Sequence, residues 1–259
     1  MSATPPLLLE ARDVRIRIGE RVLCRELSFQ LGKGERLAIL GRNGAGKSTL
    51  LAALAGLRAT DGGGIFLSGV SCNFLQAREA AKRRGFLPQV QQDAFASTVL
   101  ETALIGRHPH LGRFAWESAD DVAFARTALA FVGLKGMDQR NVHSLSGGER
   151  QRLGVATLLT QEPDLYLLDE PLTHLDLNHA IAVLDVFSRC AEQGAGVVMV
   201  LHEPGLAARY CDRVLLLYGD GRTEIGPVTE LLTAERLSVL YGHPLRTLDD
   251  RGKPWFIPE

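Results

Sequence analysis

The sequence predicts an α/β fold with a parallel sheet at its centre, and three features of the chain support this prediction. Residues 36–40 form a short, mostly apolar run of strand length, followed by a glycine-rich loop and a helical pattern over residues 48–55. Residues 165–168 and 197–201 are unbroken apolar runs, which are typical of strands buried on both faces of a parallel sheet. Ligands of such sheets bind at the carboxyl ends of the strands, so the residues that follow each run are candidates for function.

The loop after the first strand has the pattern G-x-x-x-x-G-K-[ST]. It consists of Gly41, Arg42, Asn43, Gly44, Ala45, Gly46, Lys47, Ser48 and Thr49. Its glycines allow successive backbone N–H groups to turn toward an anion, and the N-terminus of the following helix adds partial positive charge. Lys47 would reach the β and γ phosphates of a nucleotide, and the Ser48 hydroxyl would ligate Mg²⁺. A turn that merely joins strand to helix is the alternative, but the flanking elements favour a phosphate loop that binds a nucleoside triphosphate.

The overall composition argues against several other classes of protein. The 259 residues can bury a sizeable core, and a formal net charge of −1 does not favour a nucleic-acid platform. No apolar run approaches the roughly 20 residues that span a bilayer, and no secretory signal is evident. The four cysteines lack C-x-x-C spacing, so we interpret them as reduced, buried residues of a cytosolic protein. A role at a membrane would therefore need a partner.

The segments around the phosphate loop indicate an additional, antiparallel sheet. Residues 7–31 contain an alternating run at 14–18, a turn, and a second strand. A further short strand is predicted at residues 65–67, and a basic, alanine-rich helix at residues 76–84. Gln89 lies just past the end of the next short strand, and taken alone it is best interpreted as an ordinary loop glutamine.

From residue 90 to about residue 160 the pattern becomes helical. Residues 118–121, Ser-Ala-Asp-Asp, can cap a helix that ends at Gly133. One face of this helix carries the apolar residues Val122, Ala125, Leu129 and Val132.

A second helix start lies at residues 145–152. Ser146 and Glu149 have capping-box spacing, so a well-made helix start is one interpretation. A cap does not explain Gly147 and Gly148, however. Because glycines leave room for an anion to approach backbone N–H groups, an anion site is the second interpretation.

The buried strands end in residues that carry chemistry. Asp169 and Glu170 follow one strand, where Asp169 fits a Mg²⁺ partner through water and Glu170 could polarise an attacking water. A solvated acidic turn is the alternative. His202 follows the other strand, and a lone histidine there is more often structural. The remaining chain is predicted to form a hairpin at residues 214–225, helices to residue 241 and a tail without clear periodicity.

In this order, the segments resemble the ATP-binding subunit of an ABC transporter over nearly the whole chain. The similar elements are Walker A at residues 41–49, the Q-loop at Gln89, the signature at residues 145–151, Walker B with its catalytic glutamate at residues 165–170, the D-loop at Leu175-Asp176 and the switch histidine at His202. Six elements in the family's order outweigh the purely structural interpretations of Gln89 and His202.

The resemblance implies a fold and a division of the chain. The expected fold is a P-loop NTPase with a RecA-like core, an N-terminal antiparallel β-subdomain and an inserted helical subdomain. Residues 1–89 and 161–241 would form the core and β-subdomain, residues 90–160 the helical subdomain and residues 242–259 a C-terminal tail of one domain.

The resemblance also implies the site residues, with ATP and Mg²⁺ as cofactors. The catalytic residues would be Lys47, Glu170 and His202; residues 41–49 would bind ATP together with Gln89, Ser146, Gly147, Gly148 and Asp176; Mg²⁺ would be held by Ser48, Gln89 and Asp169. Each ATP would lie between Lys47 of one chain and Ser146 and Gly147 of the other, in a two-fold homodimer.

Two positions depart from the family's pattern. An aromatic residue usually stacks on adenine just before the early turn, but Ile18 stands there, so the preference for ATP over GTP is open. After His202 the family more often continues with Asp-Leu, whereas this chain has Glu203-Pro204-Gly205. Because proline fixes φ and removes a backbone donor, we expect a stiffer loop there.

The resemblance further implies partners and a location. The chain would act at the cytoplasmic face of the inner or plasma membrane, on integral membrane permease subunits and, indirectly, a periplasmic or surface binding protein, without nucleic acid. A soluble ABC ATPase acting on a cytosolic assembly and an unfused exporter subunit are the alternatives.

The cargo is indicated by kinship alone. Residues 99–116 and 171–177 are similar to segments of ATPases of iron-siderophore, haem and vitamin B12 importers. We therefore expect a type II importer of a metal chelate, with vitamin B12 or a ferric siderophore ahead of haem. His108 and His110 lack an evident third ligand, so an exposed loop near the permease is favoured over a metal site.

Overall fold

The computed structural model describes residues 7–90, 96–112, 115–250 and 252–259. A six-stranded sheet runs through its centre in the order β10-β9-β3-β8-β7-β6. Its strands are β3 (Arg36–Leu40), β6 (Arg84–Leu87), β7 (Leu165–Leu168), β8 (Gly196–Val200), β9 (Arg213–Leu217) and β10 (Thr223–Pro227). All pair in parallel except β10, which forms a hairpin with β9. The predicted parallel α/β sheet and the hairpin are confirmed.

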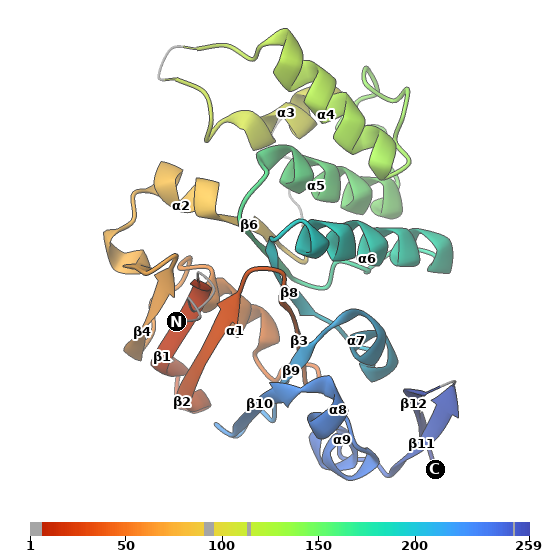
Figure 1. The fold of residues 1–259 in the computed structure, drawn as a ribbon. Helices are drawn as coiled ribbons and strands as arrows, with labels where there is room; N and C mark the ends of the chain where they lie inside the picture. Colours follow the sequence, from red (N-terminus) through yellow and green to blue (C-terminus); the bar gives the residue numbers. More distant parts are fainter. Residues whose placement is uncertain (1–6, 91–95, 113–114, 251) are drawn as a thin grey trace, which may run out of the picture.

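A second sheet of four antiparallel strands lies beside the first (Figure 1), in the order β2-β1-β4-β5. It consists of β1 (Leu7–Ile18), β2 (Arg21–Gly32), β4 (Gly62–Leu67) and β5 (Val70–Ser71). The turn between β1 and β2 begins at Gly19, whose φ of 58° suits glycine. This sheet corresponds to the antiparallel subdomain that the resemblance implied.

The alternation of side chains along the central strands divides the core in two. Leu37 and Ile39 of β3 face α1 (Lys47–Leu54) and the antiparallel sheet, whereas Ala38 and Leu40 face the remaining helices. Both groups are fully buried, which explains why these strands are unbroken apolar runs. On the second face lie α6 (Leu177–Glu192), α7 (Pro204–Tyr210), α8 (Val228–Leu231) and α9 (Ala234–Tyr241). α2 (Ala77–Arg83) contacts the edge strand β6, and η1 (Cys72–Phe74) contacts β4 of the antiparallel sheet.

The helical part of the chain rises above β6 (Figure 1). It contains α3 (Val99–Leu104), η2 (Ile105–Arg107), α4 (Ala119–Phe131), η3 (Val142–Ser144) and α5 (Gly147–Gln161). The predicted cap of α4 is present, because Ser118 and Asp121 form a reciprocal capping box. Ala125 and Leu129 on its apolar face are buried. These helices pack on α5, which therefore joins them to the central sheet.

The last residues form a structure that the sequence did not indicate. The tail folds into an antiparallel hairpin of β11 (Leu245–Asp250) and β12 (Lys253–Pro258), and β12 packs against α7. Pro204 is the first residue of α7, where a missing N–H costs nothing, so the expected stiff loop is instead a helix start.

Two general expectations can be compared with the described residues. Cys24 and Cys211 are buried free thiols, as expected, whereas Cys72 and Cys190 are only partly buried. In the part of the chain that the structure describes, no helix combines the length and apolar character needed to cross a membrane.

Candidate active site

Four neighbouring strands of the central sheet end next to one another, and each is followed by a predicted site residue. The glycine loop follows β3, His202 follows β8, Asp169 and Glu170 follow β7, and Gln89 follows β6. Because β3, β8, β7 and β6 are adjacent and parallel, these residues gather at one edge of the sheet. In the sequence these residues belong to separate motifs. The order of the strands in the sheet places them in one cluster.

The loop from Gly41 to Gly46 has the backbone of an anion cradle. Gly44 and Gly46 have φ values of 74° and 102°, which turn the chain before α1. A β-carbon on Gly41 would lie 2.5 Å from the carbonyl oxygen of Leu217, so only glycine fits against β9 there. In the described residues no side chain caps the N-terminus of α1. The first N–H groups of that helix are therefore available to an anion.

Lys47 is folded back onto this loop. Its side chain is buried, and its ammonium group donates to the carbonyl oxygens of Gly41 (2.9 Å) and Arg42 (3.2 Å). Burial lowers the pKa of Lys47, and the nearby carboxylates of Glu170 and Asp169 oppose that shift. A phosphate group beside Lys47 would add negative charge where the ammonium group now donates to backbone carbonyl oxygens.

Ser48 and Asp169 form the oxygen-rich part of the cluster. The Ser48 hydroxyl donates to Asp169 Oδ1 at 3.0 Å, and Asp169 is buried. Burial raises the pKa of Asp169, and the hydrogen bond from Ser48 opposes that shift. Hydroxyl and carboxylate oxygens are ligands that Mg²⁺ prefers. The described residues contain no cluster of three or more His, Cys, Asp or Glu side chains that could hold an ion alone, so phosphate and water oxygens would have to complete this site.

Glu170 is held from two sides. Gln89 Nε2 donates to Glu170 Oε2 at 2.8 Å, and His202 Nε2 lies 2.9 Å from Glu170 Oε1. The Glu170 side chain is 14% exposed and the His202 side chain 45%, so the pair opens toward solvent. Glu170 has a φ of 50°, which is unusual for a residue with a side chain.

The predicted anion site at α5 lies at the surface. Ser146 is exposed and forms a capping box with Glu149, which confirms the helix-start interpretation. Gly147 and Gly148 lie against His174, and a β-carbon on Gly148 would be 2.9 Å from the His174 carbonyl oxygen. Gly148 therefore has a packing reason as well as the proposed chemical one.

Comparison with known proteins identifies the family. The family model described as ABC transporter matches residues 24–173, more than half of the chain. The chain belongs to the ABC transporter family. As a member of this family it binds ATP and hydrolyses it, and the expected P-loop NTPase fold is confirmed.

Two similar proteins are both named as import ATP-binding proteins. The hemin import ATP-binding protein HmuV of Deinococcus radiodurans is 41% identical over 248 residues, which cover 94% of this chain and 93% of that protein. The petrobactin import ATP-binding protein FpuD of Bacillus anthracis is 37% identical, over 83% and 81% of the two chains. Among solved structures, a metal-chelate type ABC transporter in an inward-facing conformation has a TM-score of 0.84, 31% identity and 98% coverage of both chains.

Asp176 of this ABC ATPase, the predicted D-loop residue, lies in the segment that joins β7 to α6. Asp176 is exposed and caps α6 by accepting a hydrogen bond from the N–H of His179 (2.9 Å). This bond lowers the pKa of Asp176. The Asp176 carboxylate also lies 2.8 Å from His179 Nδ1, so within one chain this side chain bonds to His179 rather than to Glu170 or Ser146.

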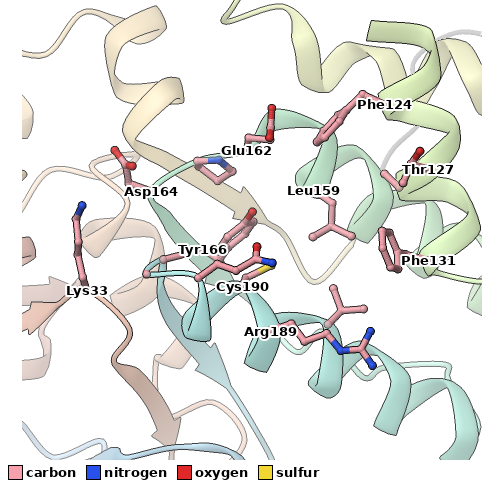
Figure 2. A pocket seen from close by; sticks show the side chains of 16 residues that line it. Lys33, Phe124, Thr127, Phe131, Leu159, Glu162, Asp164, Tyr166, Arg189 and Cys190 are labelled. Carbon is pink, nitrogen blue, oxygen red and sulfur yellow. The ribbon is translucent and has the colours of Figure 1, made fainter. Parts of the chain in front are cut away.

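A well-formed cavity of this ABC ATPase lies away from the ATP-binding motifs. Figure 2 shows it between α4 and α6, with Phe124, Tyr166 and Arg189 in its wall. Its volume is about 440 Å³, and Asp164 and Lys33 mark the end of the sheet where β7 and β3 begin. None of the predicted ATP ligands lines it. The residues predicted to bind ATP and Mg²⁺ after these strands lie at the opposite ends of the strands.

Two residues that sequence reasoning missed hold the site in place. Gln151 is buried and donates to the carbonyl oxygens of Pro171 (3.1 Å) and Glu170 (3.5 Å). Arg21 donates to the carbonyl oxygens of Gly44 (2.7 Å) and Gly219 (3.0 Å). Gln151 belongs to the quoted signature segment, so its position was a usable signal. Arg21 had none, because its partners are distant in sequence.

Proposed function

We propose that this chain is the ATP-hydrolysing subunit of an importer for a metal chelate, and that it works as a two-fold dimer on a membrane permease. One observation carries the catalytic part: the glycine loop, Asp169 and Glu170, Gln89 and His202 follow four adjacent parallel strands. The four strand ends supply a phosphate cradle, oxygen ligands, a carboxylate and an imidazole at one edge.

The glycine loop binds the phosphates of ATP in this proposal. The uncapped N–H groups at α1 donate to phosphate oxygens, and Lys47 exchanges its carbonyl partners for the β and γ phosphates. Ser48, Asp169 and Gln89 would hold Mg²⁺, which would supply positive charge that neutralises the phosphates. Arg42, Asn43, Ala45 and Thr49 contribute to nucleotide binding as members of the loop.

Glu170 orients the water that attacks the γ-phosphate. In the nucleotide-free chain its carboxylate accepts a hydrogen bond from Gln89 and lies 2.9 Å from His202, so these two groups orient it before ATP binds. The carboxylate accepts a proton of the attacking water, and the His202 imidazole donates to the γ-phosphate. Gln89 links the ATP site to the permease.

The second half of each ATP site comes from the partner in the dimer. Ser146 and Gly147 are exposed, and within one chain the Ser146 hydroxyl accepts a hydrogen bond from the N–H of Glu149. We propose that Ser146, Gly147 and Gly148 contact the γ-phosphate held by Lys47 of the other chain, and that Asp176 lies at the same interface.

Two variants test this shared site. Lys47→Ala should lose nucleotide affinity, whereas Ser146→Arg should bind ATP without dimerising or hydrolysing it. A mixture of the two restores one complete site, so it should recover part of the phosphate release. Wild-type hydrolysis by Ser146→Arg alone would show that the segment is only a helix start.

The division of the chain follows from the same proposal. Residues 90–160 form the helical subdomain that meets the permease, and residues 1–89 and 161–241 form the core and β-subdomain. His110 Nε2 lies 2.8 Å from the carbonyl oxygen of Gln161, and His108 lies 3.7 Å from Glu117. Both histidines thus have partners in the fold, which supports an exposed loop over a metal site.

The names of similar proteins support a metal chelate as the cargo. One relative is named for the import of hemin and another for the import of petrobactin, and the similar solved structure is of a metal-chelate type transporter. The subunit would act on the cytoplasmic face of the membrane, with a binding protein delivering cargo from the other side.

Reconstitution tests the transport function. The chain is assembled with its own permease and binding protein in vesicles, and hemin, a ferric siderophore and cobalamin are supplied separately. One of these should stimulate ATP hydrolysis and accumulate inside. Stimulation only by a sugar or an amino acid would refute the cargo class, and failure to assemble with any permease would favour a soluble ABC ATPase.

A further inference from the structure

The C-terminal end of α9 contacts two segments of the predicted ATP site, at His202 and at Arg42. The Tyr241 hydroxyl donates to the backbone carbonyl oxygen of His202 at 3.5 Å. Burial raises the pKa of Tyr241 to about 12, so the hydroxyl keeps its proton at neutral pH and can act as the donor. Gly242, the next residue, lies beside Arg42 of the glycine loop, because a β-carbon there would be 3.3 Å from Arg42 Nη1. The end of α9 therefore contacts both the phosphate loop and the strand end that carries His202.

Trp255 of β12 makes a second contact to the same region. A β-carbon on Gly205 would lie 2.6 Å from Trp255 Cε3, closer than side chains approach in real structures. Gly205 is the second residue of α7, which begins two residues after His202. One turn later the Arg209 guanidinium lies 5.3 Å from the centroid of the Trp255 ring. The indole ring thus covers the first turn of α7.

The hairpin that carries Trp255 is fastened to α9. The N–H of Leu245 donates to the Ser238 hydroxyl at 2.8 Å, and the N–H of Glu259 donates to the Pro244 carbonyl oxygen at 3.2 Å. Leu245 and Phe256 pack against the larger hydrophobic cluster. Trp255 and Tyr241 therefore belong to one supported unit.

We propose that Tyr241 and Trp255 are positioning residues for His202. Tyr241 holds the His202 carbonyl and Trp255 holds the helix that follows, so the imidazole stays in line with Glu170, 2.9 Å away. This inference rests on the proposed role of His202 and adds a function for the C-terminal hairpin.

The test measures kcat, KM for ATP and nucleotide affinity with the full chain. Tyr241→Phe removes only the hydroxyl, and its control is Tyr210→Phe, at the other end of α7, whose hydroxyl bonds to Asp185. We expect Tyr241→Phe to lower kcat about threefold to tenfold, with KM and affinity unchanged, and Tyr210→Phe to match the unaltered protein. Trp255→Ala should lower kcat likewise, and Trp255→Phe, which keeps a flat ring on Gly205, should recover most of it.

The His202→Ala background separates positioning from general damage. If Tyr241 acts through the imidazole, Tyr241→Phe should have no further effect on kcat there. The same fold loss in that background, or a loss that appears in KM, would overturn the positioning role. Unimpaired hydrolysis by His202→Ala would instead refute the proposed role of His202, whereas impaired His202→Ala with unaffected Tyr241→Phe would refute this inference alone.

Discussion

Two helix caps of the same geometry allow the role of Ser146 to be measured. Ser146 and Ser118 both begin helices as capping boxes, and each hydroxyl accepts the N–H three residues later at 3.2 Å. Replacing either serine by alanine removes one such bond, and Ser118→Ala also removes the hydrogen bond that the Ser118 hydroxyl donates to Asp121 Oδ2 at 2.8 Å. Each substitution should therefore lower the free energy of unfolding by about 1 kcal/mol. For a chain of this length, that corresponds to a fall of about 2 °C in melting temperature.

The two variants should differ only in activity. Ser118 lies in the helical part, away from the strand ends, so Ser118→Ala should hydrolyse ATP normally. Ser146→Ala should lose about tenfold or more in kcat, because a hydrogen bond to charged phosphate is also lost. Thermal melting and phosphate release, measured on both proteins, give the comparison. Equal loss of stability with equal, unaffected hydrolysis would refute the assignment of Ser146 to the shared ATP site.

Three further substitutions test the residues at the strand ends and the residue predicted to cover the adenine. Glu170→Gln should keep ATP binding but reduce hydrolysis by about 10²–10⁴, trapping an ATP-bound dimer on size exclusion; near-normal phosphate release would contradict it. Burial raises the pKa of Asp169, so its contribution to stability is present below about pH 4 and is lost as pH rises. Asp169→Asn should therefore melt at a higher temperature than the unaltered nucleotide-free protein at pH 7, less so near pH 4, and should not hydrolyse ATP; lower stability at pH 7 would refute this reasoning. Ile18→Tyr should tighten ATP binding by about 0.5–1.5 kcal/mol by stacking, and an unchanged dissociation constant would mean that another residue covers the adenine.

The central strands could be predicted because each is buried on both faces. The predicted strand at residues 36–40 is the observed β3, and the runs that precede Glu170 and His202 are β7 and β8. Continuous burial leaves a local mark in the sequence that requires no knowledge of neighbours. The order of the strands in the sheet could not be predicted from the sequence. Only this order makes the four strand ends adjacent.

The C-terminal hairpin could not be predicted from its own residues. Neither β11 nor β12 alternates clearly, and a two-stranded sheet is marginal without packing against other elements. Its support comes from Ser238 in α9 and from Gly205 in α7, which are distant in sequence from Trp255. Pro204 illustrates the same point, because a local rule predicted a stiff loop where the chain starts a helix.

The nucleotide-free cluster satisfies its own polar groups, and this suggests how ATP changes it. Lys47 donates to loop carbonyls, and Glu170 is occupied by Gln89 and His202. Because phosphates compete for Lys47 and His202, and the attacking water competes for Glu170, we infer that ATP replaces these contacts and releases Gln89. The backbone of Glu170 need not move with them, since Gln151 holds its left-handed conformation by donating to the carbonyl oxygens of Glu170 and Pro171. The side chains of Lys47, His202 and Glu170 would thus exchange hydrogen-bond partners while the backbone at the end of β7 stays in place. The released Gln89 side chain would then couple this change to the permease.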